Sequence, residues 1–134
     1  MASVAVALWA DATRCPCLSA ENYGECCAPY HRGEAFAPTA ERLMRSRYSA
    51  FALGATDYLL ATWHSTTRPA SLTLEAGQRF YRLDILGASG GGLLEITGTV
   101  EFIAHSVTDG IAEQQRENSR FVKESGRWVY REAL

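Results

Sequence analysis

The four cysteines are the residues whose types and spacing point most clearly to chemistry. Cys15 and Cys17 flank a single proline, Cys26 and Cys27 are adjacent, and no other cysteine occurs in the chain. Zn²⁺ prefers four thiolate or imidazole ligands in a tetrahedron, and two close pairs joined by a short loop can supply them. The pattern therefore predicts one structural zinc ion bound by Cys15, Cys17, Cys26 and Cys27. His31, four positions after Cys27, is the rival fourth ligand.

Other thiol chemistries compete with structural zinc. Thiolates also bind Cu(I) and iron–sulfur clusters, but this spacing matches no cluster pattern that we can derive. Redox chemistry at Cys15 or Cys26 is a further alternative, although the chain has no Cys-x-x-Cys motif. A secreted disulfide scaffold would distribute its bridges through the fold and would not leave every residue after Cys27 unbridged. We therefore expect a zinc site in a cytoplasmic protein.

Length and composition narrow the class of protein. The chain has 134 residues, of which 47% are hydrophobic, so it fits one domain of ordinary size or a compact domain with a small appendage. Its net charge of -2 argues against a generally basic nucleic-acid-binding protein. No apolar run approaches the roughly 20 residues that a membrane span needs. Residues 1–12 lack the positively charged start of a signal peptide, and we expect an N-terminal arm there.

Two helices are expected directly after the cysteine-rich segment. Residues 13–38 have neither a helical nor a strand period, so their fold should depend on the metal, whose binding is worth about 10–16 kcal/mol in zinc-finger peptides. Thr39 is a good N-cap and Gly54 a natural stop, which predicts a helix between them. A shorter, mostly apolar helix follows, with Asp57 as its cap and His64 at its end.

The remainder of the chain changes to a strand period. We expect a turn of helix at 74–77, a flexible glycine turn at 90–92, and strands near 79–88, 93–106, 111–124 and 127–131. The dipeptides Asp109-Gly110 and Ser125-Gly126 are typical of hairpin turns, so the last three strands should form an antiparallel meander. Helices followed by a curved antiparallel sheet indicate the α+β class.

The cysteine segment also resembles a known motif. The run Cys15-Pro16-Cys17-Leu18-Ser19-Ala20, followed by Tyr23 and Cys26-Cys27, is similar to the SEC-C motif, a zinc knuckle also found at the C-terminus of the SecA translocation ATPase. This chain has Leu18 and Ala20 where the motif usually has glycine, the residue that eases tight turns with positive φ.

The resemblance extends to the YchJ family of small bacterial proteins. It continues through the segments 29–31, 43–51, 58–64, 100–104, 119–121 and 126–130. It implies a zinc knuckle at residues 13–38 followed by an α+β cone at residues 39–134, like that of nuclear transport factor 2 and ketosteroid isomerase. It implies no reaction.

A cone of this kind can enclose a pocket between its helices and its sheet. A cross-strand pair between Glu101 and Arg120 is plausible, and one interpretation places this pair on the pocket floor, where His64 would join it in acid–base chemistry. We favour the competing interpretation, because charged strand residues usually face water. In it the pair faces solvent, where it would contribute about 0–1 kcal/mol, and the neighbouring aromatic residues are simply core. The candidate pocket residues are Arg47, Tyr48, Trp63, His64, Glu101 and Arg120.

Three hypotheses about function follow. The first is a binding module, in which the knuckle recognises a protein partner or the cone takes a small ligand. The second is a small isomerase- or hydrolase-like enzyme that uses Glu101, Arg120 and His64. The third is a metal carrier or redox sensor. Because no nucleophile elbow, phosphate loop or dinucleotide fingerprint occurs, we favour the first and assign no catalytic residue. If the knuckle is a detachable module, Cys17→Ser should unfold residues 13–32 and spare the cone.

Overall fold

The computed structural model describes residues 10–134, so most of the expected N-terminal arm lies outside the described residues. The described chain runs from a small knuckle through helices to an antiparallel sheet, which confirms the α+β class. Its elements are η1 (Tyr23–Glu25), α2 (Ala28–His31), α3 (Ala40–Leu53), α4 (Thr56–Ala61), β1 (Gln78–Gly90), β2 (Thr97–Thr108), β3 (Ile111–Glu124) and β4 (Arg127–Ala133). Among the described residues, no helix is long and apolar enough to cross a membrane.

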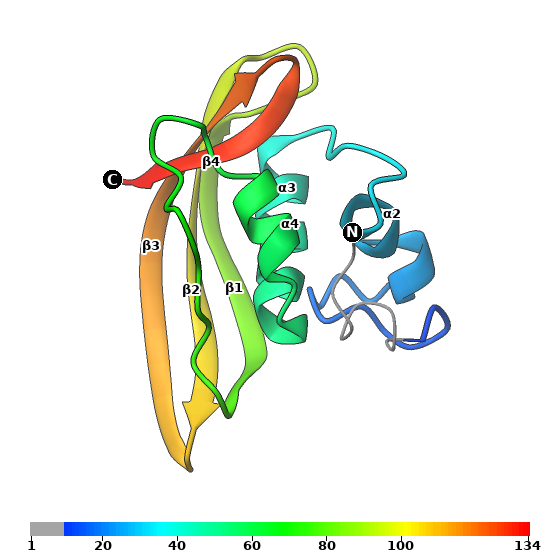
Figure 1. Cartoon of the computed structure of the whole chain (residues 1–134), viewed down its shortest axis with the longest axis vertical. Coiled ribbons are helices and arrows are strands. Elements are labelled where there is room, and N and C mark those ends of the chain that lie inside the picture. The colour runs from blue at the N-terminus through cyan, green and yellow to red at the C-terminus, as the bar shows by residue number, and fades with distance from the viewer. Residues whose placement is uncertain (1–9) are drawn as a thin grey trace.

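The sheet is a meander in the order β1-β2-β3-β4, with every neighbouring pair antiparallel. Asp109 and Ser125 have φ of 51° and 54°, and the glycine after each also has a positive φ. This backbone matches the two-residue hairpin turns expected from the sequence. In Figure 1 the sheet curves around α3 and α4, and the knuckle lies on the other side of these helices. The layers are therefore sheet, helices and knuckle.

The two central helices begin and end for local reasons. Thr39 accepts a hydrogen bond from the Arg42 backbone N–H at 3.1 Å, and Gly54 ends α3 with φ of 72°. The predicted cap of α4 is wrong, because Ala55 is the N-cap. Asp57 lies in the first turn, where its carboxylate still favours the positive end of the helix dipole. The turn of helix expected at 74–77 is also absent, and the connection stays irregular up to β1.

The glycine turn before β2 is packed against a helix. Strand β2 begins at Thr97, four residues later than predicted. Gly91, with φ of 79°, accepts a hydrogen bond from the Ala40 backbone N–H at 3.0 Å. A Cβ atom at Gly91 would lie 2.6 Å from the Cβ of Ala40. The close approach, and not flexibility, explains the glycine at this position.

One hydrophobic cluster joins the knuckle to the cone. The four cysteines, which are at most 2% exposed, belong to the same cluster as Tyr48 and Leu59 of the helices and Ala104 of β2. A second cluster lies between the start of α3 and the sheet and includes Leu43, Val100 and Phe121. The knuckle is therefore packed as a part of the protein core and not as a separate module.

Candidate functional site

The structure brings the four thiols together. Their Sγ atoms all lie within 4.8 Å of one another, with 3.5 Å between Cys17 and Cys26 and 3.9 Å between Cys26 and Cys27. A tetrahedron with Zn–S bonds near 2.3 Å places its sulfur atoms about 3.8 Å apart, whereas a disulfide needs about 2.05 Å. All four cysteines are free. Both the donor set and the sulfur spacing therefore fit a four-coordinate zinc ion, which Cys15, Cys17, Cys26 and Cys27 would hold.

The loop between the two cysteine pairs bends at two positions with positive φ. Leu18 and Ala20 have φ of 65° and 72°, a region in which glycine is comfortable and other L-residues are strained. The Leu18 N–H donates to the Cys15 carbonyl at 3.1 Å, and the Cys15 N–H donates to the Glu21 carbonyl at 2.9 Å. The chain therefore keeps the glycine backbone of the motif with larger residues.

Close packing favours the thiolate at one cysteine and opposes ionisation at two of its neighbours. Hydrogen bonds from the Cys15 and Cys27 thiols hold the pKa of Cys17 far below its usual value. A hydrogen bond with the Cys17 thiol raises the pKa of Cys15 to about 12. A hydrogen bond with the Cys15 thiol, together with burial, raises the pKa of Cys27 far above its usual value. Because a metal ion binds thiolates, a divalent cation at the centre would remove this opposition.

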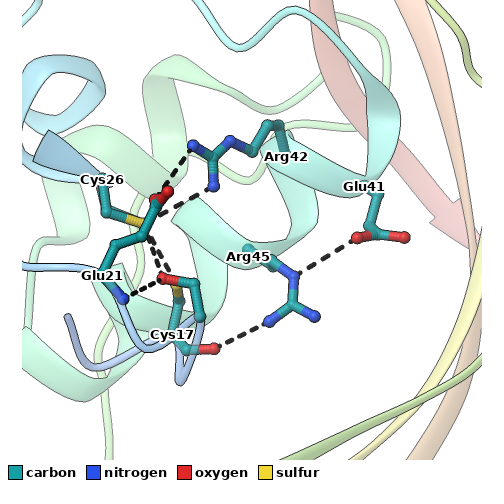
Figure 2. Close-up of polar contacts among 8 residues, drawn as sticks. Cys17, Glu21, Cys26, Glu41, Arg42 and Arg45 are labelled. Atoms are coloured by element: carbon teal, nitrogen blue, oxygen red, sulfur yellow. Dashed lines mark hydrogen bonds and ion pairs between the residues drawn. The ribbon is translucent and has the colours of Figure 1, made fainter. Parts of the chain in front are cut away.

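Arginines from α3 reach the outer side of the knuckle (Figure 2). Arg42 Nη1 donates to Cys26 Sγ at 3.7 Å, and its Nη2 lies 3.5 Å from Glu21. Arg45 Nη1 donates to the Cys17 carbonyl at 3.1 Å. Zinc with four thiolates would carry a net charge of -2, and the Arg42 guanidinium would offset part of that charge. Its contacts with Cys26 and Glu21 also tie the knuckle to the helix.

His31 lies outside the sulfur cluster and joins the knuckle to α3. Its Nε2 donates to the Ser46 carbonyl at 2.8 Å, so its Nδ1 accepts from the Tyr23 hydroxyl at 2.6 Å. This tautomer follows because a carbonyl oxygen can only accept. Burial lowers the pKa of His31 and favours the neutral ring. With both ring nitrogens bonded to protein groups, neither is free to bind a metal.

A cavity of about 390 Å³ lies between α3 and the concave face of the sheet. Three of the six predicted pocket residues, Arg47, Tyr48 and Trp63, line it. The other three, His64, Glu101 and Arg120, do not. The cavity is also lined by residues 72–75 of the connection before β1 and by side chains of the strands.

The predicted pair of Glu101 and Arg120 is wrong. The cross-strand neighbour of Glu101 is Asn118, and its carboxylate accepts from exposed Arg116 at 3.2 Å. Arg120 lies 3.5 Å from Glu132. The physical reason is strand alternation: Phe102 takes the cavity side, so Glu101 must face outward.

His64 lies apart from these residues and from the cavity. Its Nε2 is 3.5 Å from the Glu124 carboxylate, and its Nδ1 accepts from the Thr66 backbone N–H at 3.1 Å. The three groups of the acid–base hypothesis therefore share no site.

Arg47 carries a positive charge into the cavity wall. It is 6% exposed, and its Nη1 donates to the Leu59 carbonyl at 2.8 Å and to the Thr62 hydroxyl at 2.7 Å. Its guanidinium lies 5.1 Å from the Trp63 ring centre and 4.9 Å from that of Tyr130. Burial lowers the pKa of Arg47 to about 10, which still leaves the side chain charged at neutral pH.

Comparison with known proteins places the chain in a family. Residues 39–133 match the family model described as YchJ, middle NTF2-like domain. The chain belongs to the YchJ family. A UPF0225 protein of Corynebacterium efficiens is 55% identical over 119 residues, which cover 87% of this chain and 89% of the relative. A UPF0225 protein of Streptomyces coelicolor is 50% identical over 116 residues, which cover 87% of this chain and 90% of the relative.

Solved structures support both the fold and the motif of this YchJ-family chain. The solution structure of a SEC-C motif-containing protein from Rhodopseudomonas palustris has a TM-score of 0.77 and 34% identity, covering 90% of this chain and 96% of that one. The crystal structure of a SEC-C motif-containing protein from Psychrobacter arcticus has a TM-score of 0.75 and 27% identity, covering 91% and 82%. The expected family and architecture are thus confirmed.

Sequence reasoning missed several polar residues of the YchJ-family cavity. Glu117 accepts hydrogen bonds from the Ser119 hydroxyl and, at 3.1 Å, from the Tyr130 hydroxyl, and all three line the cavity. The sequence did contain a signal for Glu117 and Ser119. They precede the buried Phe121 by four and two residues, so in a strand they lie on the same face as Phe121. Arg42 was missed as a neighbour of the sulfur cluster, since only the fold brings α3 to the knuckle.

Proposed function

We propose that this YchJ-family chain is a small-ligand-binding protein whose cone holds one ligand and whose knuckle holds one structural zinc ion. The cavity of about 390 Å³ carries the proposal. Small-molecule sites have volumes of roughly 300–1,000 Å³, are mostly apolar and contain a few well-placed polar groups. Here those polar groups are the buried Arg47 and the hydrogen-bonded Glu117.

The zinc ion has a structural role in this proposal. Four thiolates fill a tetrahedral coordination shell, which leaves no position for water or substrate. The buried cysteines belong to the same hydrophobic cluster as Tyr48 and Leu59, so the metal would stabilise the helices that form one wall of the cavity. Thiolate ligands persist best in a reducing compartment, which favours a cytoplasmic location.

Ligand binding is favoured over the two other functions considered. The enzyme hypothesis needs Glu101, Arg120 and His64 at one site, and the cavity contains none of them. A protein-recognition role would use the knuckle, whose cysteines face the core and whose arginine contacts come from the chain's own α3.

The proposal is tested by a fragment screen on the zinc-loaded full chain. A chemically mixed library of soluble fragments is added to labelled protein, and backbone amide shifts are followed by NMR. We expect shifts to concentrate at cavity-lining residues such as Phe102, Ser119 and Tyr130.

The matched control is Ala104→Leu, because Ala104 is 6% exposed and lines the cavity, so leucine would fill part of the space. This variant should lose the shifts. The function would be refuted if no fragment class shifted the cavity residues, or if Ala104→Leu bound the same fragments equally well.

A further inference from the structure

We propose that the ligand of the cavity is a planar aromatic monocarboxylate, with its carboxylate at Arg47 and Trp63 and its ring between the aromatic walls. This inference rests on the ligand-binding function proposed above. It concerns the chemical class of the ligand, which the position of the cavity alone does not define.

Aromatic side chains form a large part of the cavity wall. The cavity is lined by seven of the fourteen aromatic residues of the chain, namely Tyr48, Phe51, Trp63, Phe80, Phe102, Phe121 and Tyr130. Several meet edge to face, including Tyr48 with Phe80 at 5.5 Å and Trp63 with Tyr130 at 5.3 Å between ring centres. Rings in this arrangement offer both faces and edges to a flat guest, which favours a planar ligand over a flexible chain.

Three residues that line the cavity, Tyr48, Trp63 and Arg47, carry polar atoms without a hydrogen-bond partner among the described residues. The indole Nε1–H of Trp63 is buried and has no partner within the part of the chain that the structure describes. Arg47 forms no ion pair with any described residue, and its hydrogen bonds there come from Nη1 alone. A guanidinium has five N–H groups and an indole nitrogen only donates, so both side chains need an acceptor.

A carboxylate is the acceptor that fits these donors best. It matches the fork of the guanidinium with two parallel hydrogen bonds, and its charge compensates that of the buried arginine. Tyr130 links Arg47 to Glu117, because the Arg47 guanidinium lies against its ring and Glu117 accepts from its hydroxyl. Within residues 10–134, Glu117 acts on the Arg47 charge from a distance but forms no ion pair with it, so a ligand can still make the direct contact with the guanidinium.

Glu117 also limits the charge of the ligand. Its carboxylate is held inside the cavity by hydrogen bonds from Ser119 and Tyr130. A second negative group on the ligand would lie near this carboxylate and be repelled. The cavity therefore selects one acid group at Arg47, with an uncharged ring beyond it.

The test compares four probes by isothermal titration calorimetry on the zinc-loaded full chain: 2-naphthoate, 2-naphthamide, 2-naphthylmethylamine and octanoate. We expect 2-naphthoate to bind at least tenfold more tightly than the amide or octanoate and the amine not to bind. Trp63→Phe, which keeps an aromatic ring but removes the indole N–H, should weaken 2-naphthoate about threefold to tenfold and leave the amide nearly unchanged. Arg47→Met should weaken 2-naphthoate more than thirtyfold.

The outcomes separate the two proposals. If the amide or the amine binds as tightly as the acid and Ala104→Leu abolishes that binding, the carboxylate inference fails and the ligand-binding function stands. If octanoate binds as tightly as 2-naphthoate, the inference that the ligand is planar and aromatic fails. If no probe binds and the mixed library also leaves the cavity unshifted, both proposals fail. Trp63→Phe keeps the test decisive even where Arg47→Met fails to fold.

Discussion

Replacing His31 with leucine separates a structural histidine from a metal ligand. The side chain is buried, and its two ring nitrogens bond to the Tyr23 hydroxyl and the Ser46 carbonyl. Leucine has a similar volume, so the main loss is that of these two hydrogen bonds. Leaving a buried polar group without its partner costs about 1–3 kcal/mol. His31→Leu should therefore lower the free energy of unfolding by about 2–6 kcal/mol, a large part of the stability of an ordinary domain.

The assay combines urea unfolding, followed by circular dichroism, with elemental analysis of the native protein. His31→Leu should unfold at clearly lower urea and still contain one equivalent of zinc. His31→Gln is the matched control, because its amide can donate to the Ser46 carbonyl and should recover part of the loss. Tyr23→Phe, which removes one hydroxyl, should cost about 1–2 kcal/mol. If His31→Leu lost its zinc while Tyr23→Phe had no effect on stability, the histidine would be a ligand and the reasoning would be refuted.

Four further predictions follow from the geometry. Ala20→Gly should raise the free energy of unfolding by about 0.5–1 kcal/mol, because φ is 72° at this position and glycine adopts that angle without strain. A lower free energy of unfolding in urea would contradict this. Gly91→Ala should lower it by about 1–3 kcal/mol, since the new Cβ would meet Ala40; an unchanged midpoint would show that the turn can move. Cys17→Ser should abolish the near-UV circular dichroism signal of the whole chain, because the knuckle and the cone share one core. If hydrogen exchange showed loss of protection only in residues 13–32, that shared core would be contradicted. Glu101→Gln should change stability by only about 0–1 kcal/mol and leave 2-naphthoate binding unaltered, which calorimetry would check.

The local features of the fold were predictable where short-range rules decide them. Thr39 and Gly54 mark the ends of α3 because capping depends on a few adjacent residues. The hairpins at Asp109-Gly110 and Ser125-Gly126 follow from backbone angles that few residues tolerate. The cysteine pairs likewise carry their chemistry in their spacing, and their sulfur atoms do lie together.

Features set by tertiary packing were not predictable in the same way. Alternation shows that Glu101 and Phe102 face opposite ways, but the direction of each depends on which face the helices cover. The aromatic residue takes the cavity side, so the acid points outward. His31 was a plausible ligand by spacing, and only its contact with Ser46 of α3 shows its structural role. The Gly91 turn became interpretable only when the fold placed Ala40 against it.

The most direct test of the proposed zinc site is native mass spectrometry of protein purified without added metal or a histidine tag, repeated after a chelator and after thiol alkylation. The expected result is a mass one zinc ion above that of the reduced chain, resistant to mild chelation and lost with the tertiary near-UV signal when the thiols are alkylated. A metal-free chain with four free or disulfide-linked cysteines and a cooperative unfolding transition would contradict it, because the four clustered thiols would then fold without the proposed cation.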